Sequence, residues 1–360
     1  MKKALFIFHF TFLILHVLFP HRGVGGFVIA QNRDTQAPKS SEADALTLPL
    51  FGATLCTVSL EETQLFYEKG FGMTLRGPVQ QDAKSKALER KMYGIAADID
   101  WQLYFLERPT TPALKVRVML LNKPTPTIHK SWNTLELGVL ALGFPNDIQP
   151  KLDSTMRRVG FGAWAPMNTY QVDAPDKSKY TVFETIFNGP DFVKGVGITR
   201  GDGMNQLSPT DSLTGYGGPG YSSVIVDNSD QIIDFYVNVL GYEVRSDRVW
   251  TTSGALGVPA GTQYRFLTIY AKGSRWGHLL FIEFKNQKAY DVGVAKKIPN
   301  RGLGCWTFPC KDLNAVWQKA KEKKYTILQP PTAINSPYYG QRKAMTLLAP
   351  NGFLIEIFQN

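Results

Sequence analysis

Residues 221–242 read YSSVIVDNSDQIIDFYVNVLGY, and this stretch decides the fold. Its first six residues are rich in aromatic and β-branched side chains and predict a strand. Asn228 is a typical helix N-cap, and apolar residues then recur at the spacing of one helix face, at Ile232, Phe235, Tyr236 and Val239. Gly241 is typical of a helix end. The stretch therefore predicts a strand, a capped amphipathic helix and a turn.

This strand–cap–helix unit occurs four times. The junctions between strand and helix fall at residues 59, 147, 228 and 312, so they are separated by 88, 81 and 84 residues. At the first junction, Ser59 and Glu62 form a capping box. Extended segments rich in β-branched and aromatic residues follow each helix, which predicts four βαβββ modules. Pairing the modules in chain order predicts two domains, 49–205 and 215–360, joined by the glycine-rich stretch Gly215–Gly220.

The N-terminus has the pattern of an export signal. Lys2 and Lys3 precede a long apolar run, and residues 28–30 (VIA) end the segment with small or short side chains that a signal peptidase reads. Residues 1–30 are therefore predicted to be a signal peptide, and the mature protein to be secreted or periplasmic. The alternative is a membrane anchor, but the run is near the short end of the roughly 20 residues that span a bilayer. Residues 31–48 are polar and predict a disordered linker.

Composition narrows the class of partner. The chain holds 40 Lys and Arg against 30 Asp and Glu, a formal net charge of +10, and cleavage after Ala30 removes three basic residues and leaves +7. Basic residues are not interleaved with aromatic ones, so no nucleic-acid partner is expected. After cleavage no apolar segment is long enough to span a membrane. The three cysteines, an odd number, predict at least one free thiol and are expected to be small buried residues: Cys56, Cys305 and Cys310.

Three stretches resemble the vicinal oxygen chelate superfamily, which includes glyoxalases, bleomycin-resistance proteins and extradiol dioxygenases. They are VIVDN with DFYVNVLGY at 224–228 and 234–242, LFYEKGFGM at 65–73, and LAPNGFLIE at 348–356. Ala349 stands where the family usually has Asp. The resemblance implies an α+β fold in which four βαβββ modules pair into two glyoxalase-like domains with cup-shaped mixed sheets. It spans nearly all of the mature chain and is weakest in the second module.

The resemblance also implies a divalent metal (Fe, Mn, Zn or Ni) held in the cup. Its ligands come from the start of each module's first strand and from the last strand. The first-strand positions are Gly52, Leu140, Tyr221 and Cys305, and none is His or Gln. The last strands offer Glu283 and Glu356, which are therefore the candidate metal ligands, with Tyr221 and Cys305 as weak further donors. The site is incomplete, so the chain is expected to hold one divalent metal or none.

The candidate site lies in the second predicted domain, where Glu283 and Glu356 are expected to face one shared cavity. Glu356 is the candidate catalytic residue, and the candidate ligand-binding residues are Tyr221, Glu283 and Tyr339. Each glutamate is a lone acid in an apolar strand, so it faces a ligand cup or pairs with an arginine. Tyr339 lines the cup entrance or only packs. For His278, which alternates with Glu283 along one strand, the sequence favours a structural role.

The sequence thus supports two main functions. The first is an exported glyoxalase-like protein that binds a small polar or aromatic molecule in its C-terminal cup. The second is an active divalent-metal lyase, isomerase or dioxygenase that uses Glu283 and Glu356. A third reading is an exported interaction protein with a degenerate cup. The superfamily shares a fold and not a reaction, so the fold does not choose among them.

Overall fold

A computed structural model describes residues 40–173, 178–204, 206–252 and 257–360. The predicted signal peptide 1–30 and the first part of the predicted linker lie outside these residues. The four βαβββ modules and the α+β fold are confirmed. Among the described residues, no helix has the length and apolar character needed to cross a membrane.

The elements follow the expected order within each module, except that module one has an additional helix, α2, between β2 and β3. Module one contains β1 (Gly52–Thr57), α1 (Leu60–Thr63), β2 (Thr74–Val79), α2 (Ala83–Tyr93), β3 (Trp101–Glu107) and β4 (Lys115–Leu121). Module two contains β5 (Gly138–Pro145), α3 (Gln149–Arg158), β6 (Asn168–Asp173), β7 (Lys179–Asn188) and β8 (Lys194–Arg200). Module three contains β9 (Tyr221–Val226), α4 (Ser229–Ile233), β10 (Glu243–Thr251), β11 (Gln263–Tyr270) and β12 (His278–Phe284). Module four contains β13 (Gly302–Cys310), α5 (Leu313–Glu322), β14 (Ile327–Ser336), β15 (Gly340–Leu348) and β16 (Leu354–Gln359).

The predicted helix starts are confirmed at three of the four junctions. Ser59 accepts a hydrogen bond from the Glu62 amide, Asn228 from the amides of residues 230 and 231, and Asp312 from the Ala315 amide. The helices α1 and α4 continue as π-helical turns, Gln64–Gly70 and Asp234–Val239. These turns lengthen both helices to the extent that the apolar spacing predicts.

The modules do not pair in chain order. The first sheet has the order β14-β15-β16-β13-β1-β4-β3-β2, so it joins modules one and four. The second sheet has the order β10-β11-β12-β9-β5-β8-β7-β6 and joins modules two and three. The predicted pairing within 49–205 and within 215–360 is therefore wrong for the sheets. All four first strands carry a similar apolar pattern, so the sequence repeat does not specify which two of them pair.

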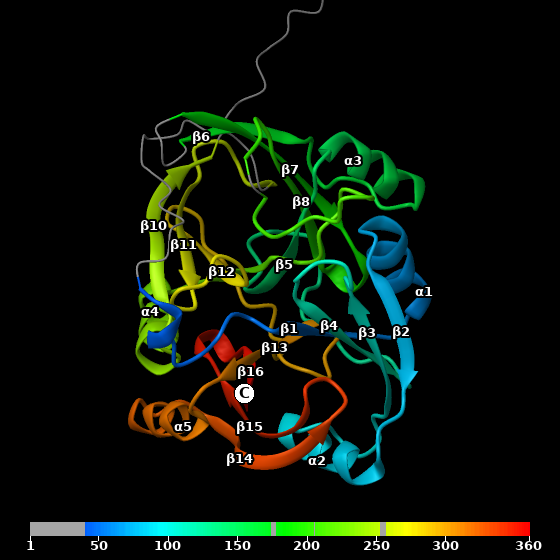
Figure 1. Ribbon diagram of the computed structural model, residues 1–360, viewed down its shortest axis with the longest axis vertical. Coiled ribbons are helices and arrows are strands. Elements are labelled where there is room, and N and C mark those ends of the chain that lie inside the picture. The colour runs from blue at the N-terminus through cyan, green and yellow to red at the C-terminus, as the bar shows by residue number, and fades with distance from the viewer. Residues whose placement is uncertain (1–39, 174–177, 205, 253–256) are drawn as a thin grey trace, which may run out of the picture.

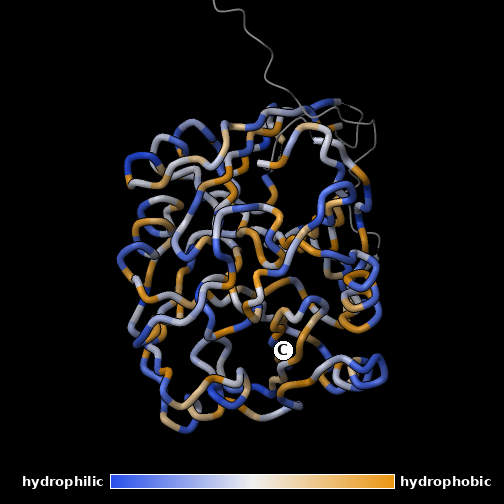
Figure 2. Tube along the Cα trace, turned by 180° about the vertical axis from the view of Figure 1, so that it is seen from behind, coloured by the Kyte–Doolittle hydropathy of each residue, from blue (hydrophilic) through white to orange (hydrophobic). Residues whose placement is uncertain are grey.

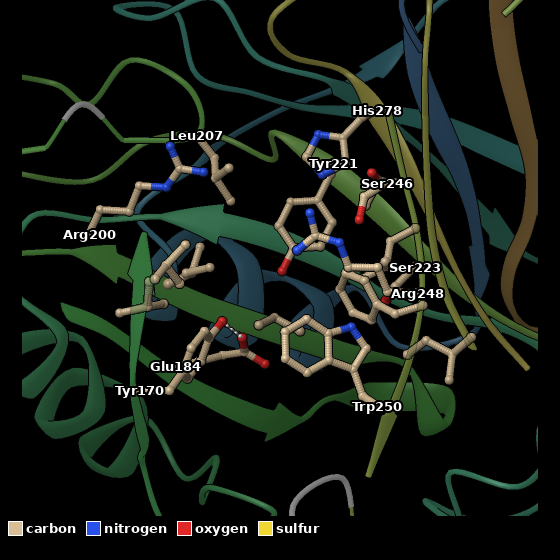
Figure 3. A pocket seen from close by; sticks show the side chains of 18 of the residues that line it. Tyr170, Glu184, Arg200, Leu207, Tyr221, Ser223, Ser246, Arg248, Trp250 and His278 are labelled. Carbon is tan, nitrogen blue, oxygen red and sulfur yellow. Dashed lines mark hydrogen bonds between the residues drawn. The ribbon is translucent and has the colours of Figure 1, made fainter. Parts of the chain in front are cut away.

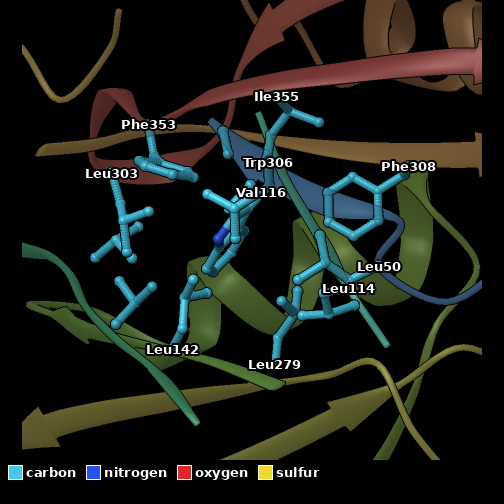
Figure 4. Close-up of a cluster of buried hydrophobic side chains, with 14 of the residues drawn as sticks. Leu50, Leu114, Val116, Leu142, Leu279, Leu303, Trp306, Phe308, Phe353 and Ile355 are labelled. Carbon is cyan, nitrogen blue, oxygen red and sulfur yellow. The ribbon is translucent and has the colours of Figure 1, made fainter. Parts of the chain in front are cut away.

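One face of each sheet packs into a shared hydrophobic core (Figure 4). Leu114, Val116 and Trp306 come from the first sheet or its margin, and Leu142 and Leu279 from the second. The indole Nε1 of Trp306 donates a hydrogen bond of 3.1 Å to Ser222 Oγ, which links the two sheets directly. The helices α1, α4 and α5 lie outside the sheets (Figure 1), and the outer loops are mostly hydrophilic (Figure 2). The opposite face of each sheet, here called its concave face, is left for other contacts.

The described part of the predicted linker, residues 40–48, is not disordered. Thr47 forms a β-bridge with Cys310, and the Leu48 amide donates a 2.8 Å hydrogen bond to the Pro309 carbonyl. The Tyr242 hydroxyl donates to the Leu48 carbonyl at 2.7 Å. Ala45 is buried as well. The expectation of disorder is therefore wrong here, because this otherwise polar segment buries a few apolar residues and bonds to the backbone at the end of β13.

The concave face of the first sheet is filled. The helix α2, which is inserted between β2 and β3, lies against β14 and β15 and buries Met92 and Tyr93. Asp82 caps this helix at its N-terminus, and Gly94 (φ 65°) ends it in the left-handed conformation. Met92 and Tyr93 join an apolar cluster with residues of this face, including Cys56, Met119, Cys305 and Phe358. A helix thus occupies the space that a ligand would need.

An ion pair completes this filling. Arg117 on β4 donates to Glu356 on β16 at 3.1 Å, and both side chains are almost fully buried, with 1% and 0% exposed. Glu356 also accepts hydrogen bonds from Tyr93, from Thr307 at 2.8 Å and from Tyr339 at 3.1 Å. We call these five residues the Arg117–Glu356 cluster. Burial alone would lower the pKa of Arg117, but the Glu356 carboxylate holds that pKa well above its usual range. The guanidinium therefore stays charged.

We predict that Glu356→Gln lowers the free energy of unfolding by about 3–5 kcal/mol, because it leaves the Arg117 guanidinium buried without its counter-charge. Urea denaturation at pH 7 measures this effect. Asp98→Asn is the control, since it removes an exposed ion pair with Lys123 that solvent screens, so its effect on stability is expected to be small. Equal effects of the two substitutions would contradict a structural role for the cluster.

Candidate ligand-binding site

The concave face of the second sheet holds a cavity of about 210 Å³. All eight strands of this sheet contribute to its walls, and most of the lining is apolar or aromatic. The aromatic residues are Tyr170, Tyr180, Tyr221, Trp250, Tyr264, Phe266 and Tyr270 (Figure 3). The ionisable residues are Glu184, Arg200, Arg248 and His278. An apolar cavity with a few polar groups is the usual form of a small-molecule site.

Strand periodicity places these residues on one face. On β7, Tyr180, Val182, Glu184 and Ile186 alternate with residues of the other face, and all four line the cavity. On β12 the lining residues are His278, Leu280 and Ile282. Glu283 follows Ile282 and is not among the lining residues. The alternation therefore brings Glu184 and His278 into the same cavity and turns Glu283 away from it.

Glu184 is a carboxyl group in aromatic surroundings. The Tyr170 hydroxyl donates to its Oε2 at 3.1 Å, and no described residue forms a salt bridge with it. Burial raises the pKa of Glu184, and the bond from Tyr170 only partly opposes this effect. Glu184 thus keeps its proton to a higher pH than an ordinary glutamate, and it borders the empty space (Figure 3).

His278 forms the centre of an aromatic stack. Its ring lies between those of Tyr221 and Tyr270, with centroid distances of 5.0 and 4.5 Å and interplanar angles of 17° and 14°. Burial, with the nearby charges of Arg200 and Arg245, lowers the pKa of His278 to about 3. The imidazole is therefore neutral at physiological pH. Its Nδ1 is buried and has no hydrogen-bond partner in the part of the chain that the structure describes.

Gly143 makes this stack possible. A Cβ atom at this position would lie 1.9 Å from the ring of Tyr221, so only glycine lets the ring lie flat on β5. The hydroxyl of Ser223, two residues further along β9, is buried on the same wall and also lacks a partner among the described residues. This wall thus holds two buried polar atoms, His278 Nδ1 and Ser223 Oγ, without a hydrogen-bond partner among the described residues.

The structure separates the predicted site residues. Tyr221 lines the cavity, as expected of a ligand-binding residue. Glu283 instead accepts a 3.0 Å hydrogen bond from the Ser229 amide and pairs with Lys285 at 2.5 Å. Glu356 and Tyr339 belong to the Arg117–Glu356 cluster in the other sheet. The expectation that Glu283 and Glu356 share a cavity is therefore wrong, because the modules that carry them belong to different sheets.

Cys305 also lies in the first sheet, where it is fully buried, and burial raises its pKa. All three cysteines are free and buried, which confirms their expected character. The predicted C-terminal cup likewise does not exist as one unit. The cavity lies in the second sheet, which modules two and three form together. Module four belongs to the first sheet, whose concave face is filled.

Members of this superfamily commonly use a divalent metal, but the donors of this chain do not fit one. At the centre of the first sheet, Thr54 lies opposite Arg117 and Thr307 lies opposite Glu356 on the neighbouring strand. The Arg117 guanidinium already pairs with the Glu356 carboxylate, so this carboxylate is not available to a metal ion. In the second sheet the lining of the central strands is mostly Leu, Ile and Val, at Leu140, Val196, Ile198, Leu280 and Ile282. Across the described ranges, no three His, Cys, Asp or Glu residues gather closely enough to hold a metal ion.

Sequence reasoning missed Glu184 and underestimated His278. The signal for Glu184 was present, since β7 reads KYTVFETIFN and its one acid shares a face with Tyr180, Val182 and Ile186. The neighbours of His278 in the stack come from β9 and β11, and nothing in the local sequence reveals them. The insertion of α2 was also missed, although Asp82 and Gly94 carry cap signals at both of its ends.

Known proteins show the same fold. Glyoxalase I from Zea mays is similar, with a TM-score of 0.56 and 16% identity over 88% of this chain and 94% of that one. A putative dioxygenase from Bacillus subtilis is similar with a TM-score of 0.52 and 12% identity, over 88% of this chain and 86% of that one. Among curated proteins, none matches the sequence significantly.

One family model matches part of the sequence. It is that of the Glyoxalase/Bleomycin resistance protein/Dioxygenase superfamily, and it covers residues 218–357. This range contains modules three and four, which carry the clearest of the quoted stretches. The resemblance to the vicinal oxygen chelate superfamily is therefore confirmed: residues 218–357 match its family model, and the paired modules of the whole described chain have the fold of glyoxalase I.

Proposed function

We propose that this protein is an exported small-molecule-binding protein of the vicinal oxygen chelate superfamily, with its ligand site in the cavity of the second sheet. The observation that supports this most strongly is the difference between the two concave faces. The first is filled by α2 and the Arg117–Glu356 cluster, whereas the second keeps a cavity walled by aromatic side chains. A preformed apolar space with a few polar groups on its walls is the usual form of a small-molecule site.

The lining favours a planar, largely apolar ligand. Tyr170, Tyr264 and Trp250 offer ring faces and edges against which an aromatic ligand packs, at about 0.5–1.5 kcal/mol per aromatic pair beyond area burial. Glu184 adds one group that accepts a hydrogen bond when ionised and donates one when protonated. We expect binding without a divalent ion, because no three His, Cys, Asp or Glu side chains of the described walls lie together.

The export step rests on the sequence pattern of residues 1–30, which lie outside the described residues. The described N-terminal segment, residues 40–50, is bound to the body of the molecule through Thr47 and Leu48.

We predict that 2-methylnaphthalene binds to the purified protein with micromolar affinity, measured by isothermal titration calorimetry, and that EDTA leaves this affinity unchanged. Leu280 is half-buried and lines the cavity, so Leu280→Trp fills the space and lowers the affinity at least tenfold. Leu213→Trp, at a position that is 92% exposed, is the matched control and leaves binding intact. Equal binding by the wild type and Leu280→Trp would place the ligand elsewhere.

We predict opposite pH effects for two glutamates. Burial raises the pKa of Glu184, so its ionisation destabilises the fold as the pH rises above about 4.3, the ordinary value for Glu. Glu184→Gln is therefore more stable than the wild type at pH 7, and the difference disappears near pH 4. For Glu283, burial is outweighed by the bonds from Lys285 and Ser229, which lower the pKa, so Glu283→Gln is less stable than the wild type at pH 7. Thermal denaturation between pH 4 and 8 checks both signs.

We predict that protein recovered from its native host begins at or near Gln31. The basic start, the apolar run and the VIA end of residues 1–30 are the reason. N-terminal sequencing of the secreted or periplasmic fraction measures it. Protein that retains Met1 in that fraction would refute cleavage and favour the membrane anchor.

A further inference from the structure

We infer that Ser223 and His278 form a subsite for a negatively charged oxygen, so that the ligand is a planar aromatic carboxylate. This inference rests on the proposed function, because it concerns the same cavity of the second sheet. It adds the chemical group that distinguishes the true ligand from an apolar compound of similar shape.

The first argument is hydrogen-bonding capacity that the protein leaves unused. Ser223 is 2% exposed and His278 is 5% exposed, and both line the cavity. Neither Ser223 Oγ nor His278 Nδ1 has a hydrogen-bond partner among the described residues. An unsatisfied buried polar group costs about 1–3 kcal/mol, so a ligand atom that satisfies it is strongly favoured.

The second argument is geometry. The strands β9 and β12 are parallel neighbours, with His278 opposite Tyr221 and Leu280 opposite Ser223. Ser223 and His278 therefore lie on the same face of adjacent strands, two positions apart, and both project toward the cavity. The stack with Tyr221 and Tyr270 holds the imidazole rigidly, which lowers the entropic cost of binding.

The third argument is the kind of ligand atom that can bond to this wall, whose two unsatisfied groups can both donate a hydrogen bond. In the tautomer with its proton on Nδ1, the neutral imidazole donates one N–H from the unsatisfied atom, and a serine hydroxyl donates one O–H. Two neighbouring donors suit one acceptor group, such as a carboxylate.

The charge distribution favours the negatively charged form of that acceptor. Arg200 and Arg245 are close enough to His278 to disfavour its protonation, and Arg245 pairs with Glu243 at 2.8 Å, so part of its charge is already offset. Figure 3 shows His278 and Arg200 at one end of the cavity and Glu184 with Tyr170 at the other. A carboxylate is therefore expected at the histidine end, away from Glu184, with the aromatic body of the ligand between them.

Two probes of similar shape test the subsite: naphthalene-2-carboxylate and 2-methylnaphthalene. We expect the wild type to bind the carboxylate at least tenfold more tightly, by isothermal titration calorimetry at pH 7. His278→Phe keeps an aromatic ring in the stack but removes the N–H, and Ser223→Ala removes the O–H. Each variant is expected to lower this ratio to threefold or less, with the affinity for 2-methylnaphthalene changed by no more than threefold. Glu283→Gln, outside the cavity, leaves the ratio unchanged.

The outcomes separate the two proposals. If the wild type binds both probes equally, or if Ser223→Ala and His278→Phe keep the full ratio, the subsite is overturned while the cavity remains a binding site. If neither probe binds to the wild type, the proposed function itself fails and the subsite with it. Circular dichroism confirms that each variant is folded, and Ser223→Ala alone decides the matter if His278→Phe does not fold.

Discussion

The structure depends on the antiparallel pairing of first strands, β1 with β13 and β5 with β9. Every residue of these four strands is buried, because each strand lies at the centre of its sheet. The pairing joins module one to module four, so the first sheet contains both ends of the described chain. The first sheet needs the last module before its strands can all pair. The second sheet is made of consecutive modules and does not need it.

The two sheets share one plan but use their concave faces differently. In the first, α2 and the Arg117–Glu356 cluster replace a cavity with a packed interior, and the charged pair is tolerated because Thr307, Tyr339 and Tyr93 satisfy the carboxylate. In the second, a cavity remains, and aromatic side chains from its strands form the walls. Duplication of a module thus gave one chain a rigid half and a half with space for a ligand.

The sequence predicted the modules well because strand and helix signals are local. The 221–242 stretch specified a strand, a cap and a helix within 22 residues, and each was found where it was expected. The pairing of modules could not be predicted, since it depends on contacts between strands with similar patterns. This error moved the candidate site as well: Glu283 and Glu356 occupy corresponding places in their modules, but correspondence within a repeat does not bring two residues together. For Glu356, pairing with an arginine, which was one of its two expected roles, is the one that the structure shows.

The kind of ligand that the open cavity suits depends on how burial acts on two of its ionisable side chains, Glu184 and His278. Burial lowers the pKa of His278 and raises that of Glu184, so both are pushed toward their neutral forms. A bound cation would act in the opposite sense on Glu184, since positive charge stabilises a carboxylate and competes for the lone pairs of imidazole. The described walls supply no third donor to offset the cost of taking such an ion out of water. Hydrogen-bonding groups in aromatic surroundings are instead suited to recognition by hydrogen bonds and stacking, in which the geometry of the ligand decides its affinity.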